Sequence, residues 1–167
     1  MHTGTDTTIH RTTVGISDMA ISNDPRVELI THALGSCLGI TAHDSVSGIG
    51  GLIHIMLPMS KIAPEKAAKN PLMFVDSGIP VFFEELFAAG AKRENIRLKV
   101  AGGAQVLDAE SHFKIGERNF TVLRKLLWKN DLLITSEDVG GNKSRTLSLY
   151  VGSGRVLVRS KEGADEL

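Results

Sequence analysis

Clusters of glycine divide most of this sequence into apolar segments that are too short for ordinary helices. The clusters lie at Gly48–Gly51, Gly102–Gly103, Gly140–Gly141 and Gly152–Gly154. Their spacing matches neither the GxGxxG nor the GxxxxGK[ST] pattern, so we interpret them as turns, bulges and close backbone contacts rather than phosphate-binding loops. A chain interrupted in this way is expected to consist mainly of strands.

Six short segments are predicted to be strands because they are β-branched, apolar or bounded by glycine. These segments are Leu38–Ala42, Ile49–Leu57, Ile96–Ala101, Leu132–Thr135, Thr146–Val151 and Arg155–Val158. The glycine-containing segment Val151–Arg155 is expected to join the last two as a hairpin. A weaker strand signal lies around Thr13–Ile21.

Two longer segments have the apolar spacing of helices. The first is Asp76–Gly90, in which Asp76 or Ser77 is the expected N-cap. The second runs from about Gly116 to Lys129, and Asn130 is expected to end it. The sum is an α/β fold, a single layered domain with a strand-rich mixed sheet and two main helices packed against it.

The length of 167 residues suits one compact domain, and the sequence contains neither an internal repeat nor a Pro/Ser-rich linker. We expect a flexible N-terminal arm over residues 1–13, the folded domain over 14–159 and a frayed tail over 160–167. The arm resembles neither a secretory signal nor a transit peptide, and no apolar run approaches the length of a membrane span. A cytoplasmic location is therefore expected, without membrane insertion.

Charge and cysteine content exclude several function classes. Nineteen basic and nineteen acidic residues give a formal net charge of +0, which argues against nucleic acid or an anionic membrane as the main partner. The single cysteine, Cys37, excludes an intramolecular disulfide and a CxxC site. No further cysteine or histidine has a ligand spacing relative to Cys37 and His54, so no metal site is predicted.

Cys37 and His54 lie on two consecutive predicted strands joined by the turn Asp44–Gly48. One face of this pair becomes wholly apolar if Leu38 lies opposite Ile53, and a slip by one residue would mix polar with apolar side chains. The same register sets Cys37 directly opposite His54, with Cβ atoms about 4.5–5.5 Å apart.

A thiol beside an imidazole can act as a nucleophile toward a carbonyl or carboxamide carbon. Small residues surround the sulfur, and backbone N–H groups near Gly35 and Ser36 are candidates for stabilising an oxyanion. The alternative is that Cys37 is a small buried hydrophobic residue, for which neighbouring glycines would serve tight packing.

The other histidines are set aside as bases. His43 is six residues from Cys37 along the strand, roughly 20 Å away, which is too far for direct proton transfer. The remaining ones lie in the expected arm or have ordinary surface or core interpretations; they are His2, His10, His32 and His112.

Six motifs, in order, resemble those of the CheD family of chemoreceptor glutamine deamidases. They are THALGSCLGIT, GIGGLIHIMLP, FVDSGIP, VAGGAQ, IGERN and EDVGGNKSRT. The resemblance extends from about Val14 to Arg159. It implies a layered α/β fold with a Cys-His core similar to that of the cytotoxic necrotizing factor deamidases, and it implies no cofactor.

The resemblance also implies roles for particular residues. Cys37 corresponds to the family nucleophile and His54 to the base, while Thr31 holds the position implicated in orienting the histidine. The residues alone leave Asp44 or Asp76 open for that last role. Further candidates for substrate contact follow the Gly140–Gly141 turn; they are Asn142, Ser144 and Arg145.

The activity implied is conversion of selected glutamine side chains of methyl-accepting chemotaxis proteins to glutamate, with the phosphatase CheC as a partner. Two alternatives stay open from the residues. One is a non-catalytic adaptor that binds receptors or CheC, and the other is a Cys-His protease, because a carboxamide and a peptide bond are chemically close.

Overall fold

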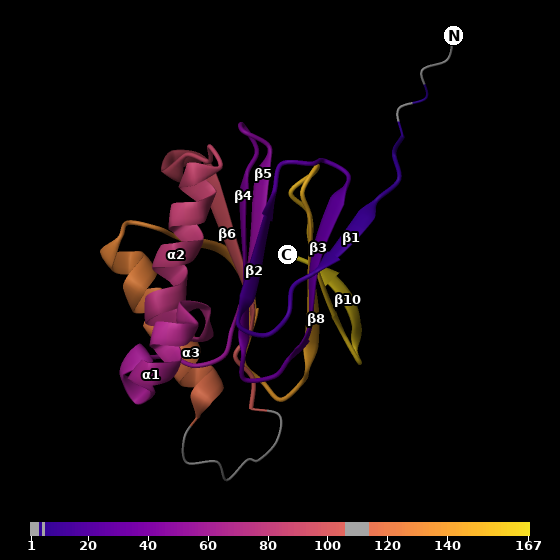
Figure 1. The fold of residues 1–167 in the computed structure, drawn as a ribbon. Helices are drawn as coiled ribbons and strands as arrows, with labels where there is room; N and C mark the ends of the chain where they lie inside the picture. Colours follow the sequence, from indigo (N-terminus) through magenta and orange to yellow (C-terminus); the bar gives the residue numbers. More distant parts are fainter. Residues whose placement is uncertain (1–3, 5, 106–113) are drawn as a thin grey trace.

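The strands form two sheets that face each other, and the helices cover the outer face of one of them (Figure 1). The computed structural model describes residues 4, 6–105 and 114–167. In chain order the elements are β1 His10–Thr13, β2 Asp18–Ser22, β3 Val27–Leu34, β4 Leu38–Asp44, β5 Ile49–Ile55, α1 Pro64–Lys69, α2 Val75–Ala88, β6 Ile96–Gly102, α3 Ile115–Lys129, β7 Ile134–Val139, β8 Arg145–Tyr150, β9 Val156–Ser160 and β10 Gly163–Glu166. Three short 3-10 turns precede α1, α2 and β6.

Each sheet has five strands and mixes parallel with antiparallel pairs. One sheet has the order β1-β3-β8-β9-β10 and the other β2-β5-β4-β6-β7. β1 runs parallel to β3 and β6 runs parallel to β7, while the other neighbours are antiparallel. The predicted layered α/β class with a mixed sheet is confirmed, and the strands divide into two such sheets.

The β2-β5-β4-β6-β7 sheet is covered on both faces; its central strands are apolar toward the helices and include buried polar side chains, among them Thr41 and His54, toward the other sheet. On the outer face Ile40 and Ile53 pack with Phe82 of α2 and Leu123 of α3. On the inner face, which we name the inter-sheet core, side chains of both sheets meet; they include Leu34, Leu52, Ala101, Leu147 and Leu149. The functional residues described below lie in or beside the inter-sheet core.

Both predicted helices are present, with one correction to their ends. α3 ends at Asn130 as expected, but α2 begins after Phe74, which provides no side-chain cap. Asp76 instead accepts hydrogen bonds from the backbone and hydroxyl of Ser60, and Ser77 donates to the carbonyl of Pro71. These two polar side chains therefore attach α2 to the preceding turns rather than cap it.

The predicted strands are present with shifted ends, and three strands were not predicted: β1, β3 and β10. The segment expected at Leu132–Thr135 forms β7 further along, at Ile134–Val139. β3 was missed because its ladder is interrupted: the pairing with β8 shifts register between Thr31 and Leu34, and Ala33 has a positive φ of 57°. The expected hairpin between β8 and β9 is confirmed.

The arm and the tail expected at the two ends each contribute a strand. β1 pairs with β3, and Arg11 forms an ion pair with buried Glu28 at 3.1 Å. β10 pairs with β9, and the final residue, Leu167, donates its N–H to Val156 and accepts a bond from Lys99. Backbone pairing thus holds residues 163–166 of the segment expected to fray, although its side chains bury little. Within the described residues, no helix is long and apolar enough to span a bilayer.

Candidate active site

The register between β4 and β5 differs by two residues from the predicted one. Leu38 lies opposite Ile55 and Gly39 lies opposite His54, so Cys37 is not directly across from the histidine. A shift by two keeps each side chain on its predicted face, because strand side chains alternate with a period of two. Cys37 directly precedes β4 and packs against the inter-sheet core, the side that His54 faces, but lies diagonal to the histidine. In a regular ladder such diagonal neighbours have Cα atoms about 7–8 Å apart.

The β4–β5 turn explains this shift. Asp44 is the last residue of β4, and its carboxylate accepts hydrogen bonds from the N–H groups of Val46, Ser47 and Lys92. Burial alone would raise the pKa of Asp44, but these backbone donors lower that pKa to about 2. Since the carboxylate closes the turn at Ser45–Gly48, Asp44 has no part in orienting His54. Asp76 has none either, because it binds Ser60.

Thr31 of one sheet contacts His54 of the other sheet. Its hydroxyl lies 2.7 Å from the carbonyl oxygen of Val14 and 2.6 Å from Nδ1 of His54. A hydroxyl has one hydrogen, and the carbonyl can only accept, so the hydroxyl donates to Val14 and accepts from Nδ1–H. This chain of bonds selects the tautomer of His54 in which Nδ1 carries the proton and Nε2 has a free lone pair.

His54 is a buried and neutral base. The residue is 1% exposed, and among the described residues its Nε2 has no hydrogen-bond partner. Burial lowers the pKa of His54 to about 4, so the imidazole is uncharged at neutral pH. An unpaired buried nitrogen is uncommon in folded proteins and calls for an explanation such as a catalytic role.

The absence of a side chain at Gly39 makes room for the contact between Thr31 and His54. A Cβ at Gly39 would lie 2.7 Å from a methyl carbon of Leu147 and 2.9 Å from one of Leu34. It would also lie 3.5 Å from the methyl group of Thr31. The glycine directly opposite His54 thus lets β3 and β8 approach β4 closely enough for Thr31 to reach the imidazole.

The loop Gly35–Cys37 is held through its three carbonyl groups. The carbonyl of Gly35 accepts from the N–H of Ala104 at 2.8 Å, and that of Cys37 from the N–H of Gly103 at 2.9 Å. The carbonyl of Ser36 accepts from the side-chain amide of Asn119 at 2.9 Å. The N–H groups of Ser36 and Cys37 bond to no other residue in the described part of the chain.

Cys37 itself is half-buried at the border of the inter-sheet core. Burial raises the pKa of its thiol, and the N–H of Cys37 opposes this by interacting with its own sulfur. The resting pair is therefore a neutral thiol and a neutral imidazole rather than an ion pair.

Comparison with known proteins places the chain in a family. A family model described as CheD chemotactic sensory transduction matches residues 56–160. A protein of Syntrophus aciditrophicus named "Probable chemoreceptor glutamine deamidase CheD 1" is 43% identical over 150 residues, which are 90% of this chain and 94% of that protein. The chain belongs to the CheD family. A "Probable chemoreceptor glutamine deamidase CheD" of Solibacter usitatus is also 43% identical, over 92% of this chain and 91% of its own length.

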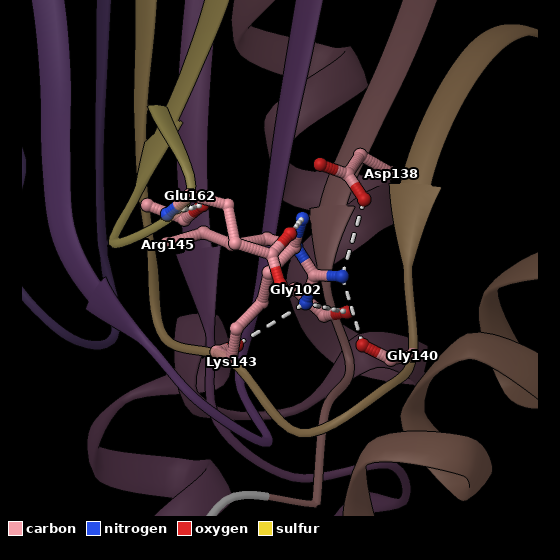
Figure 2. Close-up of polar contacts among 7 residues, drawn as sticks. Gly102, Asp138, Gly140, Lys143, Arg145 and Glu162 are labelled. Carbon is pink, nitrogen blue, oxygen red and sulfur yellow. Dashed lines mark hydrogen bonds and ion pairs between the residues drawn. The ribbon is translucent and has the colours of Figure 1, made fainter. Parts of the chain in front are cut away.

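Arg145 of this CheD-family chain is buried, unlike the two other candidates for substrate contact. Arg145 is 3% exposed, and its guanidinium lies 3.1 Å from Asp138 and 2.8 Å from the carbonyl of Gly140 (Figure 2). Weaker contacts reach the carbonyls of Gly102 and Lys143. Its side chain thus holds the Gly140–Gly141 turn against β6, whereas Asn142 and Ser144 are exposed on that turn.

The histidines set aside from the sequence lie away from the CheD-family site or are otherwise engaged. His32 is exposed, and His10 lies on β1. His43 is bonded to the carbonyl of Val151 at 2.8 Å. His2 and His112 lie outside the described residues. In the described part of this CheD-family chain no group of three or more His, Cys, Asp or Glu side chains is arranged to hold a metal ion.

Asn119 and the carbonyl of Val14 were missed from the sequence. The IGERN motif contains Asn119, yet no local signal shows that α3 would bring it to the Cys37 loop. Val14 contributes only its backbone carbonyl, and the type of a residue gives no information about such a role. For Gly102 the sequence offered a signal, the Gly102–Gly103 pair, but not its partner: a Cβ at Gly102 would overlap the carbonyl oxygen of Cys37.

Proposed function

We propose that this chain is a protein-glutamine deamidase of bacterial-type chemotaxis, acting in the cytoplasm on selected glutamine side chains of methyl-accepting chemotaxis proteins. The products are a glutamate side chain and ammonia. The curated relatives support the substrate class through their names. The observation that carries the proposal is the bond between Thr31 and His54, which leaves Nε2 of a buried imidazole as an unpaired base on the face of Cys37.

In the first step, Nε2 of His54 takes the proton of the Cys37 thiol as the sulfur attacks the carboxamide carbon. A neutral pair suits this order, since the buried site disfavours separated charges until the substrate dipole arrives. The new C–S bond forms as the C=O double bond opens. A tetrahedral intermediate with a negative oxygen results.

Backbone amides of the nucleophile loop are the candidates for stabilising that oxygen. All three carbonyls of Gly35–Cys37 accept hydrogen bonds from other segments, and the N–H groups of Ser36 and Cys37 bond to no other residue in the described part of the chain. Preorganised donors of this kind strongly stabilise a negative oxygen in a site that excludes water. Removing one donor from an oxyanion hole costs about 3 kcal/mol of transition-state stabilisation.

The second half of the reaction restores the enzyme. The proton on Nε2 moves to the departing nitrogen, the C–N bond breaks, and ammonia leaves behind a thioester on Cys37. His54 then removes a proton from a water molecule that attacks the thioester carbon. Collapse of the second tetrahedral intermediate breaks the C–S bond, and the thiol regains its proton.

Binding of the phosphatase CheC, which the family resemblance implies, stays a prediction. It is tested by co-purification of the full-length chain with CheC from the same genome, if that genome encodes one.

A Cys37→Ser variant separates a catalytic role from an adaptor role. Restored chemotaxis by this variant supports the adaptor, and loss of chemotaxis with retained binding supports the enzyme.

The direct test is incubation of the protein with receptor cytoplasmic domains, followed by peptide mass spectrometry and an ammonia assay. We expect replacement of NH2 by OH on particular glutamine side chains, together with stoichiometric ammonia, and neither product with Cys37→Ala. Backbone fragments would indicate a protease. Undiminished deamidation by Cys37→Ala would contradict the proposed mechanism.

A further inference from the structure

A single side-chain amide joins the two segments that carry the proposed nucleophile and base. Asn119 lies on α3 and is 0% exposed. Its Nδ2 donates to the carbonyl of Ser36 at 2.9 Å and to the carbonyl of Met56 at 3.1 Å. Ser36 directly precedes Cys37, and Met56 follows His54 by two residues.

We infer that Asn119 is a positioning residue for Cys37, a role that rests on the deamidase function proposed above. By binding the Ser36 carbonyl, Asn119 fixes the peptide plane whose N–H group belongs to Cys37. By binding Met56 with its second hydrogen, it holds that plane at a set distance from the end of β5.

The chemistry of the two acceptors explains why an amide occupies this position. Both partners are carbonyl oxygens, and an NH2 group offers two donors on one nitrogen, whereas a hydroxyl offers one and a carboxylate none. The orientation of the amide follows, because an oxygen facing two carbonyls would be repelled.

Packing alone does not account for Asn119. Its Oδ1 is buried and has no hydrogen-bond partner among the described residues. Folded proteins rarely leave a buried acceptor unpaired. The amide is therefore kept for the two bonds of Nδ2, which join the Ser36 and Met56 segments at the cost of an unpaired Oδ1.

The fixed peptide plane between Ser36 and Cys37 affects the environment of the Cys37 sulfur. A trans peptide directs its C=O and N–H in opposite directions, so anchoring the Ser36 carbonyl toward α3 aims the Cys37 N–H away from α3. That N–H interacts with the Cys37 sulfur and opposes the increase in thiol pKa caused by burial. Hydrogen bonds in series strengthen one another, so the amide of Asn119 also polarises the peptide.

Asn119 is the anchor of this loop that substitution can test directly. The other two anchors are backbone N–H groups of Gly103 and Ala104. α3 packs closely against the segment of Gly103 and Ala104, since a Cβ at Gly116 would lie 2.5 Å from the carbonyl carbon of Gly103. The helix and the backbone anchors thus stay in place when only the side chain of Asn119 is changed.

The experiment compares Asn119→Leu and Asn119→Ala with Leu127→Ala in the full-length chain. Leu127 lies on the same helix and is 3% exposed in the helix–sheet core, so its truncation destabilises α3 without removing a bond to the Cys37 loop. Two quantities are measured: kcat and KM for deamidation, and the rate of Cys37 alkylation by iodoacetamide as a function of pH. The chain has one cysteine, so alkylation reports that thiol alone.

We expect both Asn119 variants to lower kcat by about 10-fold to 100-fold, the size that misplacement of a catalytic group by about 1 Å produces. KM should stay within about twofold, and the alkylation profile should shift to higher pH. Leu127→Ala should lower the melting temperature while keeping the wild-type alkylation profile.

A wild-type profile and kcat in a folded Asn119 variant would overturn the inference, as would a change equal to that in Leu127→Ala. If neither Asn119 variant folds, the residue serves folding and the positioning role is likewise rejected. Alkylation needs no substrate. A wild-type chain without deamidase activity therefore contradicts the proposed function separately, while the thiol profiles still decide whether Asn119 sets the state of Cys37.

Discussion

The hydroxyl of Thr31 on β3 lies 2.6 Å from Nδ1 of His54 on β5, so the orientation of one imidazole depends on the packing of two sheets. The carbonyl of Val14 completes the chain of bonds and makes the hydroxyl an acceptor toward Nδ1–H. Carboxylates orient histidines in many Cys-His and Ser-His sites. A neutral hydroxyl instead fixes the tautomer without raising the basicity of the ring as strongly.

Replacing Thr31 by valine tests this arrangement. Valine keeps the shape but leaves Nδ1–H buried without an acceptor, which costs about 1–3 kcal/mol. We expect kcat to fall by about tenfold to 100-fold, less than for Cys37→Ala, because the imidazole remains present but is no longer held in one tautomer. Thr31→Ser keeps the hydroxyl and should retain most of the activity. Equal activity in the valine and serine variants would show that the bond has no catalytic role.

The depressed pKa of His54 predicts where activity declines in acid. Because burial lowers this pKa to about 4, kcat/KM measured against pH should have its acid limb near pH 4 rather than near the ordinary value of 6.5. An acid limb at 6 to 7 in the free enzyme would assign the titration to another group.

The same shift makes stability depend on pH. Between pH 6.5 and 4 the unfolded chain binds a proton on His54 that the folded chain does not, so the stabilisation is complete above about pH 6.5 and is lost as the pH falls toward 4. From pH 7 to pH 5 the free energy of unfolding should decrease by about 2 kcal/mol from this group. Urea titrations of the wild type and His54→Gln measure it: the substituted chain should lack this part of the decrease, and an unchanged pH dependence would contradict the assignment.

Substitution of Gly102 should damage the Cys37 loop. Gly102 has a positive φ of 111°, and an added Cβ would overlap the carbonyl oxygen of Cys37. We expect Gly102→Ala to lose most activity, with kcat measured on the fraction that remains folded. Gly140→Ala is the matched control: its φ of 88° brings a similar backbone penalty of about 1–2 kcal/mol, but no atom lies within 4 Å of its Cβ. Equal loss in both variants would attribute the effect to backbone strain alone.

Arg145 is expected to act on stability rather than on binding of the receptor. Replacing it by methionine removes the cation beside Asp138 and the donors to three carbonyls, which should cost about 3 kcal/mol of unfolding free energy. Asn142→Ala on the same turn should leave stability within about 0.5 kcal/mol. Thermal melts and receptor binding separate the roles: weaker binding by a fully stable Arg145→Met would restore Arg145 as a contact residue.

The local sequence pattern was sufficient to predict the elements that bury one continuous apolar face. α3 carries a stripe that includes Leu123 and Leu127, and both its start and its end at Asn130 follow from sequence spacing. β3 was missed because a register shift breaks its alternation, and β10 because backbone pairing with β9 holds a segment of exposed side chains. Pairing of this kind depends on a partner strand and leaves little trace in side-chain type.

Composition and spacing also determined which two side chains share a face. The parity of β4 and β5 placed the lone cysteine and His54 together, since a slip by one residue would bury polar groups against α2 and α3. Because side chains alternate with a period of two, this pattern cannot distinguish registers that differ by two residues. That difference was decided by the β4–β5 turn, where the carboxylate of Asp44 binds Val46 and Ser47 and sets Gly39, rather than Cys37, opposite the histidine.

By itself, then, the sequence determined a layered α/β domain, a single thiol, and a histidine on the same side of a sheet. Only the tertiary structure decided that Thr31 selects the tautomer of His54 and that Asn119 and Gly103 bind the loop of Cys37. These contacts join residues 23 to 83 positions apart, and hydrogen bonds across such separations depend on how sheets and helices pack rather than on any local preference of the chain.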